Sequence, residues 1–212
     1  MIWHVLNRVR QAKLIDHVML AVPEEDNNLP LIAAALSLEV CVAEIGGDPN
    51  DLVRRYALVA AKIKSDTIVR VPGDNPCVDP DEIDRIIEFY HHRNPPLHYL
   101  TTNLDRNVLD NGYPGGLGAE VYDTRFIGWL DRNVKEPRLR EHPHLWAFEN
   151  NRIVTCPWPY QPRRPELRFD VNTQSDFDFI AEVYQTLYPA NPNFRIRDIL
   201  NYLDNKKEVR IG

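Results

Sequence analysis

Residues 67–79 read Thr-Ile-Val-Arg-Val-Pro-Gly-Asp-Asn-Pro-Cys-Val-Asp. The first five residues form a β-branched run that is typical of a buried strand, and Pro72 and Gly73 then end it in a turn. Pro80 follows directly, at a position that favours the first turn of a helix. A strand, a turn with Asp74 at its tip and a helix therefore follow one another closely in the chain.

The same alternation continues on the N-terminal side of this stretch. Apolar residues at helical spacing predict helices over residues 2–9, 29–38 and 51–64, with Asp51 as a cap, and a helix from Pro80 to Tyr90. Apolar runs predict strands over residues 17–22, 39–43 and 67–71. Because parallel strands need crossover connections, this order predicts an α/β fold with a mostly parallel sheet and helices on both faces.

Beyond residues 95–96, both proline, the pattern is looser. It predicts strands over residues 97–100 and 119–122, and helices over residues 124–133, 176–188 and 196–203. Prolines at 157, 159, 162 and 165 exclude a regular helix or central strand between them. No linker composition interrupts the chain, so we expect a single domain over residues 1–212.

Composition and charge narrow the classes of function. The chain has 212 residues and a net charge of -6. It therefore lacks the excess of positive charge that is typical of proteins that bind nucleic acid or an anionic membrane surface. The longest uncharged run, residues 29–38, is too short to span a bilayer, and no signal peptide is recognisable, so we expect a cytoplasmic protein. Three cysteines without a CxxC pair argue against disulfides and zinc.

Two segments present carboxylates where a ligand could bind. Asp74 would lie outside the carboxyl end of its strand, where a hard cation and a phosphate could meet, although an Asp often only closes a turn. Glu120 ends the glycine-rich stretch of residues 113–122 and could accept hydrogen bonds from sugar hydroxyls or an amine. Alternatively, Glu120 is a solvent-facing residue of an edge strand.

Two later segments combine charged and polar residues. Residues 140–144 read Arg-Glu-His-Pro-His, a combination that suits a carboxylate or a sugar but is also common in surface turns. Residues 168–176 read Arg-Phe-Asp-Val-Asn-Thr-Gln-Ser-Asp, a strand that ends in polar residues. Capping of the last long helix is a sufficient explanation for this segment taken alone.

These four segments, in this order and spacing, resemble the cytidylyltransferases that make CMP-activated sugars, especially the branch named for spore-coat polysaccharide biosynthesis protein F. The family shows a basic-apolar strand leading to a Gly-Asp-x-Pro turn, as at residues 70–76, and an aromatic-Pro-x-Gly-Leu stretch ending in Glu-Val, as at residues 113–121. It also shows an Arg-Glu-His triplet, as at residues 140–142, and a closing strand-to-helix motif, as at residues 168–176. The resemblance covers nearly the whole chain.

The resemblance implies a three-layer, Rossmann-like sheet of the nucleotide-diphospho-sugar transferase type. It implies a reaction of CTP with a sugar acid to give a CMP-sugar and pyrophosphate, for surface polysaccharide or glycoconjugate synthesis. Magnesium would be the cofactor, with Asp74 as the catalytic metal ligand. The substrate-binding residues that it implies are Arg55, Arg70, Asn103, Tyr113, Gly116, Glu120, Arg140 and His142.

Two departures from the family pattern affect the expected site. Family members begin with a strand and a basic, glycine-containing loop that cradles the triphosphate, and we expect this chain to lack both and to be a truncated form or, alternatively, a remodelled fold. At the closing motif, Asn172 stands where the family has the second metal carboxylate. An uncharged ligand should lower the affinity for magnesium, and Asp170, two residues earlier on the same face of the strand, could substitute.

Other functions remain open on this evidence. A degenerate homologue would bind a sugar or a partner without turnover. A glycosyltransferase would use an Asp-x-Asp motif, a spacing that Asp79 and Asp81 have at the start of a helix. The family resemblance also implies a homodimer, and Trp129, Trp146, Phe148 and Trp158 would suit its interface or else the core.

Overall fold

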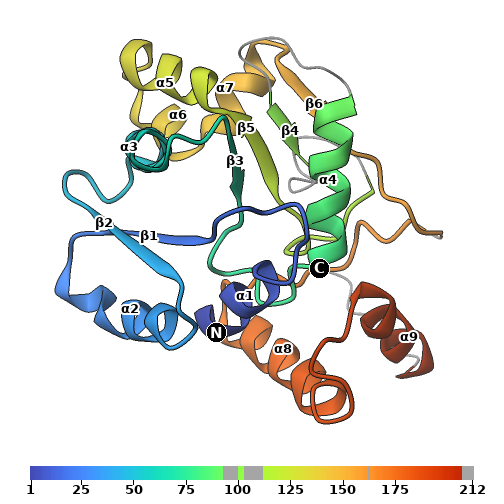
Figure 1. Cartoon of the computed structure of the whole chain (residues 1–212). Helices are drawn as coiled ribbons and strands as arrows, with labels where there is room; N and C mark the ends of the chain where they lie inside the picture. The colour runs from blue at the N-terminus through green and yellow to red at the C-terminus, as the bar shows by residue number, and fades with distance from the viewer. Residues whose placement is uncertain (93–99, 103–111, 162, 207–212) are drawn as a thin grey trace.

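Helices and strands alternate through the first half of the chain, as the sequence predicts. The computed structural model describes residues 1–92, 100–102, 112–161 and 163–206 (Figure 1). The elements of the first half are α1 (Ile2–Val9), β1 (Met19–Pro23), the 3-10 helix η1 (Asp26–Asn28), α2 (Leu29–Leu36), β2 (Cys41–Ile45), α3 (Leu52–Ile63), β3 (Thr67–Arg70) and α4 (Pro80–His92). Strands β1 and β2 each begin two residues later than the apolar runs indicate.

The second half contains short elements as well as long ones. Its elements are β4 (Leu100–Thr102), β5 (Glu120–Asp123), α5 (Thr124–Asn133), α6 (Pro137–Glu141), α7 (Pro143–Glu149), β6 (Ile153–Thr155), α8 (Gln174–Leu187) and α9 (Ile196–Lys206). The sequence predicts α5, α8 and α9 but not α6, α7 or β6, which are too short to show a hydrophobic period. The predicted strand over residues 97–100 lies mostly outside the described residues.

The described strands form two sheets. β1 and β2 pair in parallel, with Met19 opposite Cys41. The larger sheet has the order β3-β5-β4-β6, in which β4 and β6 are parallel and β5 is antiparallel to both of its neighbours. The sheets are thus α/β with parallel pairs, as predicted, but the antiparallel β5 is not anticipated by the sequence.

Helices cover both faces of the larger sheet (Figure 1). Along β3 and β5, Ile68 and Tyr122 pack into a core cluster with α3 and α5, whereas Val69 and Val121 pack into another cluster with α4 and α1. Successive residues of a strand point to opposite faces, so this division places one helical layer on each side. The three-layer prediction is therefore confirmed. No helix in the described part of the chain is long and apolar enough to cross a membrane.

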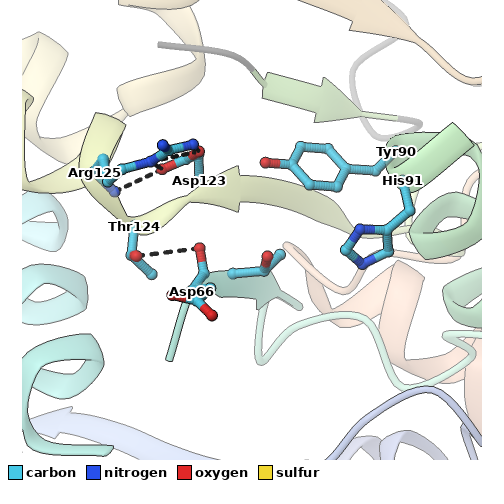
Figure 2. Close-up of a pocket in the computed structure, with 7 residues that line it drawn as sticks. Asp66, Tyr90, His91, Asp123, Thr124 and Arg125 are labelled. Atoms are coloured by element: carbon cyan, nitrogen blue, oxygen red, sulfur yellow. Dashed lines mark hydrogen bonds and ion pairs between the residues drawn. The ribbon is translucent and has the colours of Figure 1, made fainter. Parts of the chain in front are cut away.

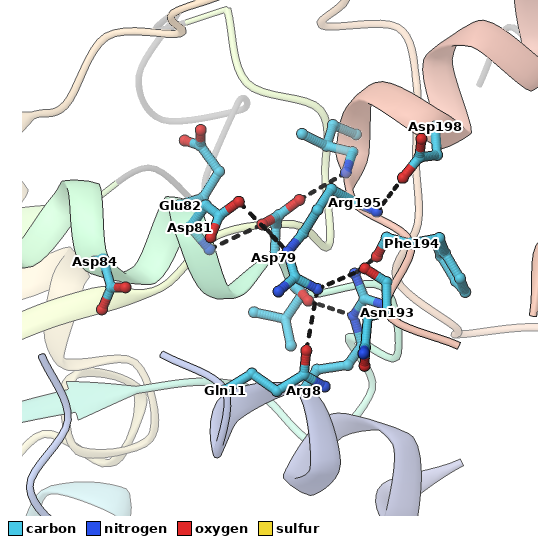
Figure 3. Close-up of polar contacts among 12 residues, drawn as sticks. Arg8, Gln11, Asp79, Asp81, Glu82, Asp84, Asn193, Phe194, Arg195 and Asp198 are labelled. Carbon is cyan, nitrogen blue, oxygen red and sulfur yellow. Dashed lines mark hydrogen bonds and ion pairs between the residues drawn. The ribbon is translucent and has the colours of Figure 1, made fainter. Parts of the chain in front are cut away.

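A buried polar cluster fixes the start of α4 to both ends of the described chain (Figure 3). The Arg8 guanidinium donates to the carbonyls of Val78 and Phe194, at 2.6 and 3.0 Å. The Asp79 carboxylate accepts the amide of Asp81 at 2.9 Å, which caps α4, and the amide of Ile196 at 2.6 Å. The turn that carries Asp74 therefore ends in a firmly anchored helix.

Candidate active site

Asp74 lies in the turn after β3, and its side chain has an unusual environment. Its Oδ1 is buried and has no hydrogen-bond partner among the described residues. Burial raises the pKa of the Asp74 carboxyl; its own backbone amide lowers it in part, and the negative charge of Asp170 raises it further. Closure of the turn accounts for the interaction with its own amide but not for the buried Oδ1 without a partner, which favours a ligand-binding role.

The segment that carries Asp170 lies directly beside this turn. The Val171 amide donates to the Asp74 carbonyl at 2.9 Å. Arg168 contacts both oxygens of Asp170, with Nη2–Oδ2 at 2.5 Å and Nε–Oδ1 at 3.2 Å. The Asn172 side-chain amide donates to Oδ2 of Asp170 at 2.6 Å. The structure thus brings together the three residues that the sequence analysis assigns to the metal.

The glycine-rich stretch holds the Asp170 segment in place. Gly115 forms a parallel bridge with Arg168, and the Phe169 amide donates to the Gly115 carbonyl at 2.8 Å. Gly116 has a φ of +80°, and a Cβ on it would lie 2.2 Å from the Asp170 backbone nitrogen. Only glycine fits there, so Gly116 acts first as a packing partner of the segment.

Asp74 and Asp170 form a donor set that fits magnesium. Mg²⁺ in phosphate-transferring sites is held by one or two carboxylates, with substrate phosphates and water completing the shell. The unpaired Oδ1 of Asp74 would supply one oxygen, and Asp170, whose oxygens contact Arg168 and Asn172 in this structure, would supply a second carboxylate. Within the described residues no group of three or more His, Cys, Asp or Glu side chains could hold a metal alone, so a metal here would also need substrate oxygens.

Glu120 lies at the centre of a buried network rather than on an exposed edge. It is 1% exposed at the start of β5, which lies between β3 and β4. Its carboxylate is 3.2 Å from Arg70 Nη1 and 3.3 Å from His144 Nδ1, and it accepts the Tyr122 hydroxyl at 2.5 Å. The solvent-facing alternative for Glu120 is therefore wrong.

The neighbouring charges determine the ionisation states of Glu120 and Arg70. Burial alone would raise the pKa of Glu120, but Arg70, His144 and Tyr122 outweigh it and lower that pKa to about 2. Burial alone would also lower the pKa of Arg70, and Glu120 more than reverses this. Both groups are therefore charged at neutral pH, as a matched pair that leaves no net charge.

The remaining predicted site residues are distributed over several elements. Arg140 bonds to Asp51, to Asp131 and to the Val134 carbonyl, at 2.9, 2.6 and 2.8 Å, so it ties α6 to α3 and α5. The His142 side chain is 47% exposed.

Of the other three predicted residues, Arg55 and Tyr113 do not join these clusters. The Arg55 guanidinium donates to the Pro49 carbonyl at 2.5 Å. Tyr113 is buried, and its hydroxyl donates to Glu82 at 2.5 Å, which makes it part of the core with Trp158. Asn103 lies outside the described residues.

A shallow hollow of about 360 Å³ lies at the other end of β3 (Figure 2). Its lining residues are Asp66, Thr67, Tyr90, His91, Asp123, Thr124 and Arg125. Arg125 contacts both oxygens of Asp123, and the Thr124 hydroxyl donates to the Asp66 carbonyl at 3.1 Å. None of the predicted site residues lines it, so it is separate from the Asp74 turn.

Comparison with known proteins relates this geometry to a family. A family model described as cytidylyltransferase matches residues 1–192. The chain belongs to the cytidylyltransferase family. An uncharacterised protein of Methanocaldococcus jannaschii is 25% identical over 97% of this chain and 80% of its own length. The spore coat polysaccharide biosynthesis protein SpsF of Bacillus subtilis is 24% identical over 85% of this chain and 74% of its own length.

The fold of the family is seen in a solved structure as well. A cytidylyltransferase from Leptospira borgpetersenii superposes with a TM-score of 0.84 and 21% sequence identity, covering 97% of this chain and 83% of the other. At this level of identity the match establishes the nucleotidyltransferase-like α/β fold. It supports the fold prediction independently of the motifs.

Sequence reasoning did not assign three residues to the buried network of Glu120 and Arg70. Tyr56 accepts a hydrogen bond from Arg70 Nε at 3.0 Å, Tyr122 donates to Glu120, and His144 contacts Glu120 from the start of α7. A signal for Tyr122 was present, since it lies two residues from Glu120 and so on the same face of the strand. His144 lies in the segment of residues 140–144 that the sequence analysis singles out, but its contact with Glu120, like that of Tyr56 with Arg70, joins distant elements and could not be predicted.

Proposed function

We propose that this member of the family is an active cytidylyltransferase that transfers CMP from CTP to a sugar acid. A hydroxyl oxygen of the sugar forms a bond to the α-phosphorus of CTP, while the bond between that phosphorus and the bridging oxygen breaks. Pyrophosphate leaves with the bond's electron pair, and the hydroxyl proton passes to solvent. The observation that carries the proposal is the unpaired, buried Oδ1 of Asp74 beside Asp170.

Asp74 and Asp170 are the residues proposed to hold magnesium, and the amide oxygen of Asn172 is a candidate third ligand. When bound, the ion would neutralise the triphosphate and stabilise charge on the leaving pyrophosphate. The chain's own contribution is positional. The anchored start of α4 fixes the Asp74 turn, and Gly116 fixes the backbone of Asp170 against the glycine-rich stretch.

The residues proposed for the sugar side divide into two kinds. His142 is exposed and could contact the substrate directly. Glu120 and Arg70 neutralise each other, and Arg140 is bonded to Asp51 and Asp131, so we assign these three a positioning role. His144, which contacts Glu120, links the network to the segment that carries His142.

The sugar acid, the surface polysaccharide or glycoconjugate context and a homodimer complete the proposal. The relative SpsF is named for spore coat polysaccharide biosynthesis, which supports a sugar as the acceptor. Catalysis in the cytoplasm, where nucleoside triphosphates are available, fits the same reaction.

The test is release of pyrophosphate from CTP with magnesium and a panel of sugar acids. Asp74→Asn removes the charge that we assign to the metal, and Asp66→Asn is the matched control, because Asp66 is an exposed aspartate at the other end of β3. We expect release that requires CTP, is lost in Asp74→Asn and is kept in Asp66→Asn. No release by the wild-type chain with any acceptor would contradict the proposal and leave a non-catalytic, sugar- or partner-binding homologue.

A further inference from the structure

Arg168 occupies both oxygens of the carboxylate that we assign to the metal. Its Nη2 lies 2.5 Å from Oδ2 of Asp170, and its Nε lies 3.2 Å from Oδ1. This bidentate ion pair uses the same two oxygens that a cation at Asp170 would use. The guanidinium and a divalent cation therefore compete for Asp170.

The ion pair of Arg168 differs in exposure and in sequence separation from the ion pairs of the arginines that hold the fold together. Arg140 and Arg164 are largely buried, with side chains 13% and 10% exposed, and each joins segments that are distant in the sequence. The Arg168 side chain is 43% exposed and pairs with a residue only two positions away on the same face of the chain. The Asp170 side chain is 14% exposed, but the guanidinium side of this pair is open to solvent, and such ion pairs contribute little free energy, so a divalent cation can displace Arg168.

Asp74 defines where the cation would enter. Its carbonyl accepts the Val171 amide at 2.9 Å, so the turn lies against the segment of Asp170. Asp74 Oδ1 is buried without a partner among the described residues, whereas Asp170 is already neutralised by Arg168. One carboxylate is thus open for a metal, and the other is held by a replaceable cation.

We propose that Arg168 holds Asp170 in its ligand position while no metal is bound, and that a divalent cation displaces the guanidinium, which then binds the phosphate oxygens of the nucleotide. The proposal rests on the proposed function. A guanidinium released next to the cation lies where the triphosphate must also lie, and its planar fork suits phosphate. Arg168 would thereby couple binding of the metal to binding of the nucleotide.

Opposite effects on metal and nucleotide test this coupling. We would measure binding of Mn²⁺ alone by its electron paramagnetic resonance signal, and binding of CTP at saturating Mn²⁺ by calorimetry. In Arg168→Gln the competitor is gone, so we expect Mn²⁺ to bind about 5–10-fold more tightly and CTP about 10-fold more weakly. Arg138→Gln is the control, since Arg138 is a half-exposed arginine paired with Glu136 and Glu149, and it should leave both affinities unchanged.

The outcomes separate this inference from the proposed function. Weaker or unchanged Mn²⁺ binding in Arg168→Gln, with normal binding in the wild type, would overturn the role of Arg168 alone. Absence of both Mn²⁺ and CTP binding in the wild type would overturn the proposed function as well. If Arg168→Gln does not fold, Arg168→Lys keeps the charge but loses the fork, and the inference then requires tighter Mn²⁺ binding and weaker CTP binding in that variant.

Discussion

Replacement of Glu120 by Gln should destabilise the protein strongly, because it leaves Arg70 without its buried counter-charge. The side chains of Arg70 and Glu120 are 18% and 2% exposed, and the carboxylate also receives the Tyr122 hydroxyl and faces His144. Gln has nearly the same size, so the change removes charge without opening a cavity. Its amide group would also place a donor among the donors that now surround the carboxylate.

Two routes give a similar magnitude for this loss. Removing one partner of a buried ion pair costs about 3–5 kcal/mol. Independently, the pKa of Glu120 is lowered from 4.5 to about 2, and a shift of this size corresponds to a stabilisation on the order of 3 kcal/mol. We therefore expect Glu120→Gln to lower the free energy of unfolding by about 3 kcal/mol.

Urea denaturation measures this difference directly. With a slope of about 2 kcal/mol/M, the midpoint should fall by roughly 1.5 M. Glu149→Gln breaks the half-exposed pair with Arg138 and should cost no more than about 1 kcal/mol, which makes it the matched control. The reasoning is refuted if Glu120→Gln loses less than about 1 kcal/mol, or no more than the control.

Three further predictions concern the acid range and the two backbone supports of the site. Because the pKa of Glu120 in the folded protein is lowered to about 2, its stabilising contribution should be present above pH 4.5 and be lost as the pH falls from 4.5 towards about 2. The urea midpoint should therefore decline less steeply over this pH range in Glu120→Gln than in the wild type. Gly116→Ala should lower the free energy of unfolding in urea by about 2–5 kcal/mol, through backbone strain and overlap with the Asp170 backbone. The control Gly47→Ala, at a φ of +111° with no atom within 4 Å, should cost only the strain of about 1–3 kcal/mol, and equal losses in the two variants would exclude the close approach at Gly116. Thr173→Ala breaks the capping box of α8 and should cost about 0.5–2 kcal/mol by thermal unfolding, while Thr173→Ser should recover most of the loss.

Local features of the sequence predicted the helices and strands of the first half well. Asp51 caps α3, as its spacing indicates, by accepting the Arg54 amide at 3.0 Å. The order and direction of the strands could not be predicted in the same way, because pairing joins distant residues. Val121 pairs with Val69 on one side and with Thr101 on the other, and no local pattern specifies either neighbour.

The candidate site was predicted in part for a similar reason. The motifs that carry Asp74 and Asp170 were recognised through the family resemblance, and the structure places the two segments together. The partners of charged residues were not predictable, because they lie far away in sequence. Arg140 bonds to Asp51, 89 residues away, and Glu120 is buried by contacts with β3 and α7 that a strand pattern does not contain.

Selective binding of CTP in the presence of magnesium tests the central claim most directly. Thermal unfolding would be followed with CTP, UTP, GTP or ATP, each with and without Mg²⁺, for the wild type and for Asp74→Asn. At a CTP concentration of about 100 times Kd, binding stabilises by about 2.7 kcal/mol, which raises Tm by about 5–10 °C for a chain of this size. We predict that rise for CTP with Mg²⁺ in the wild type and its loss in Asp74→Asn. The absence of a rise with any nucleotide, or an equal rise in Asp74→Asn, would contradict the account.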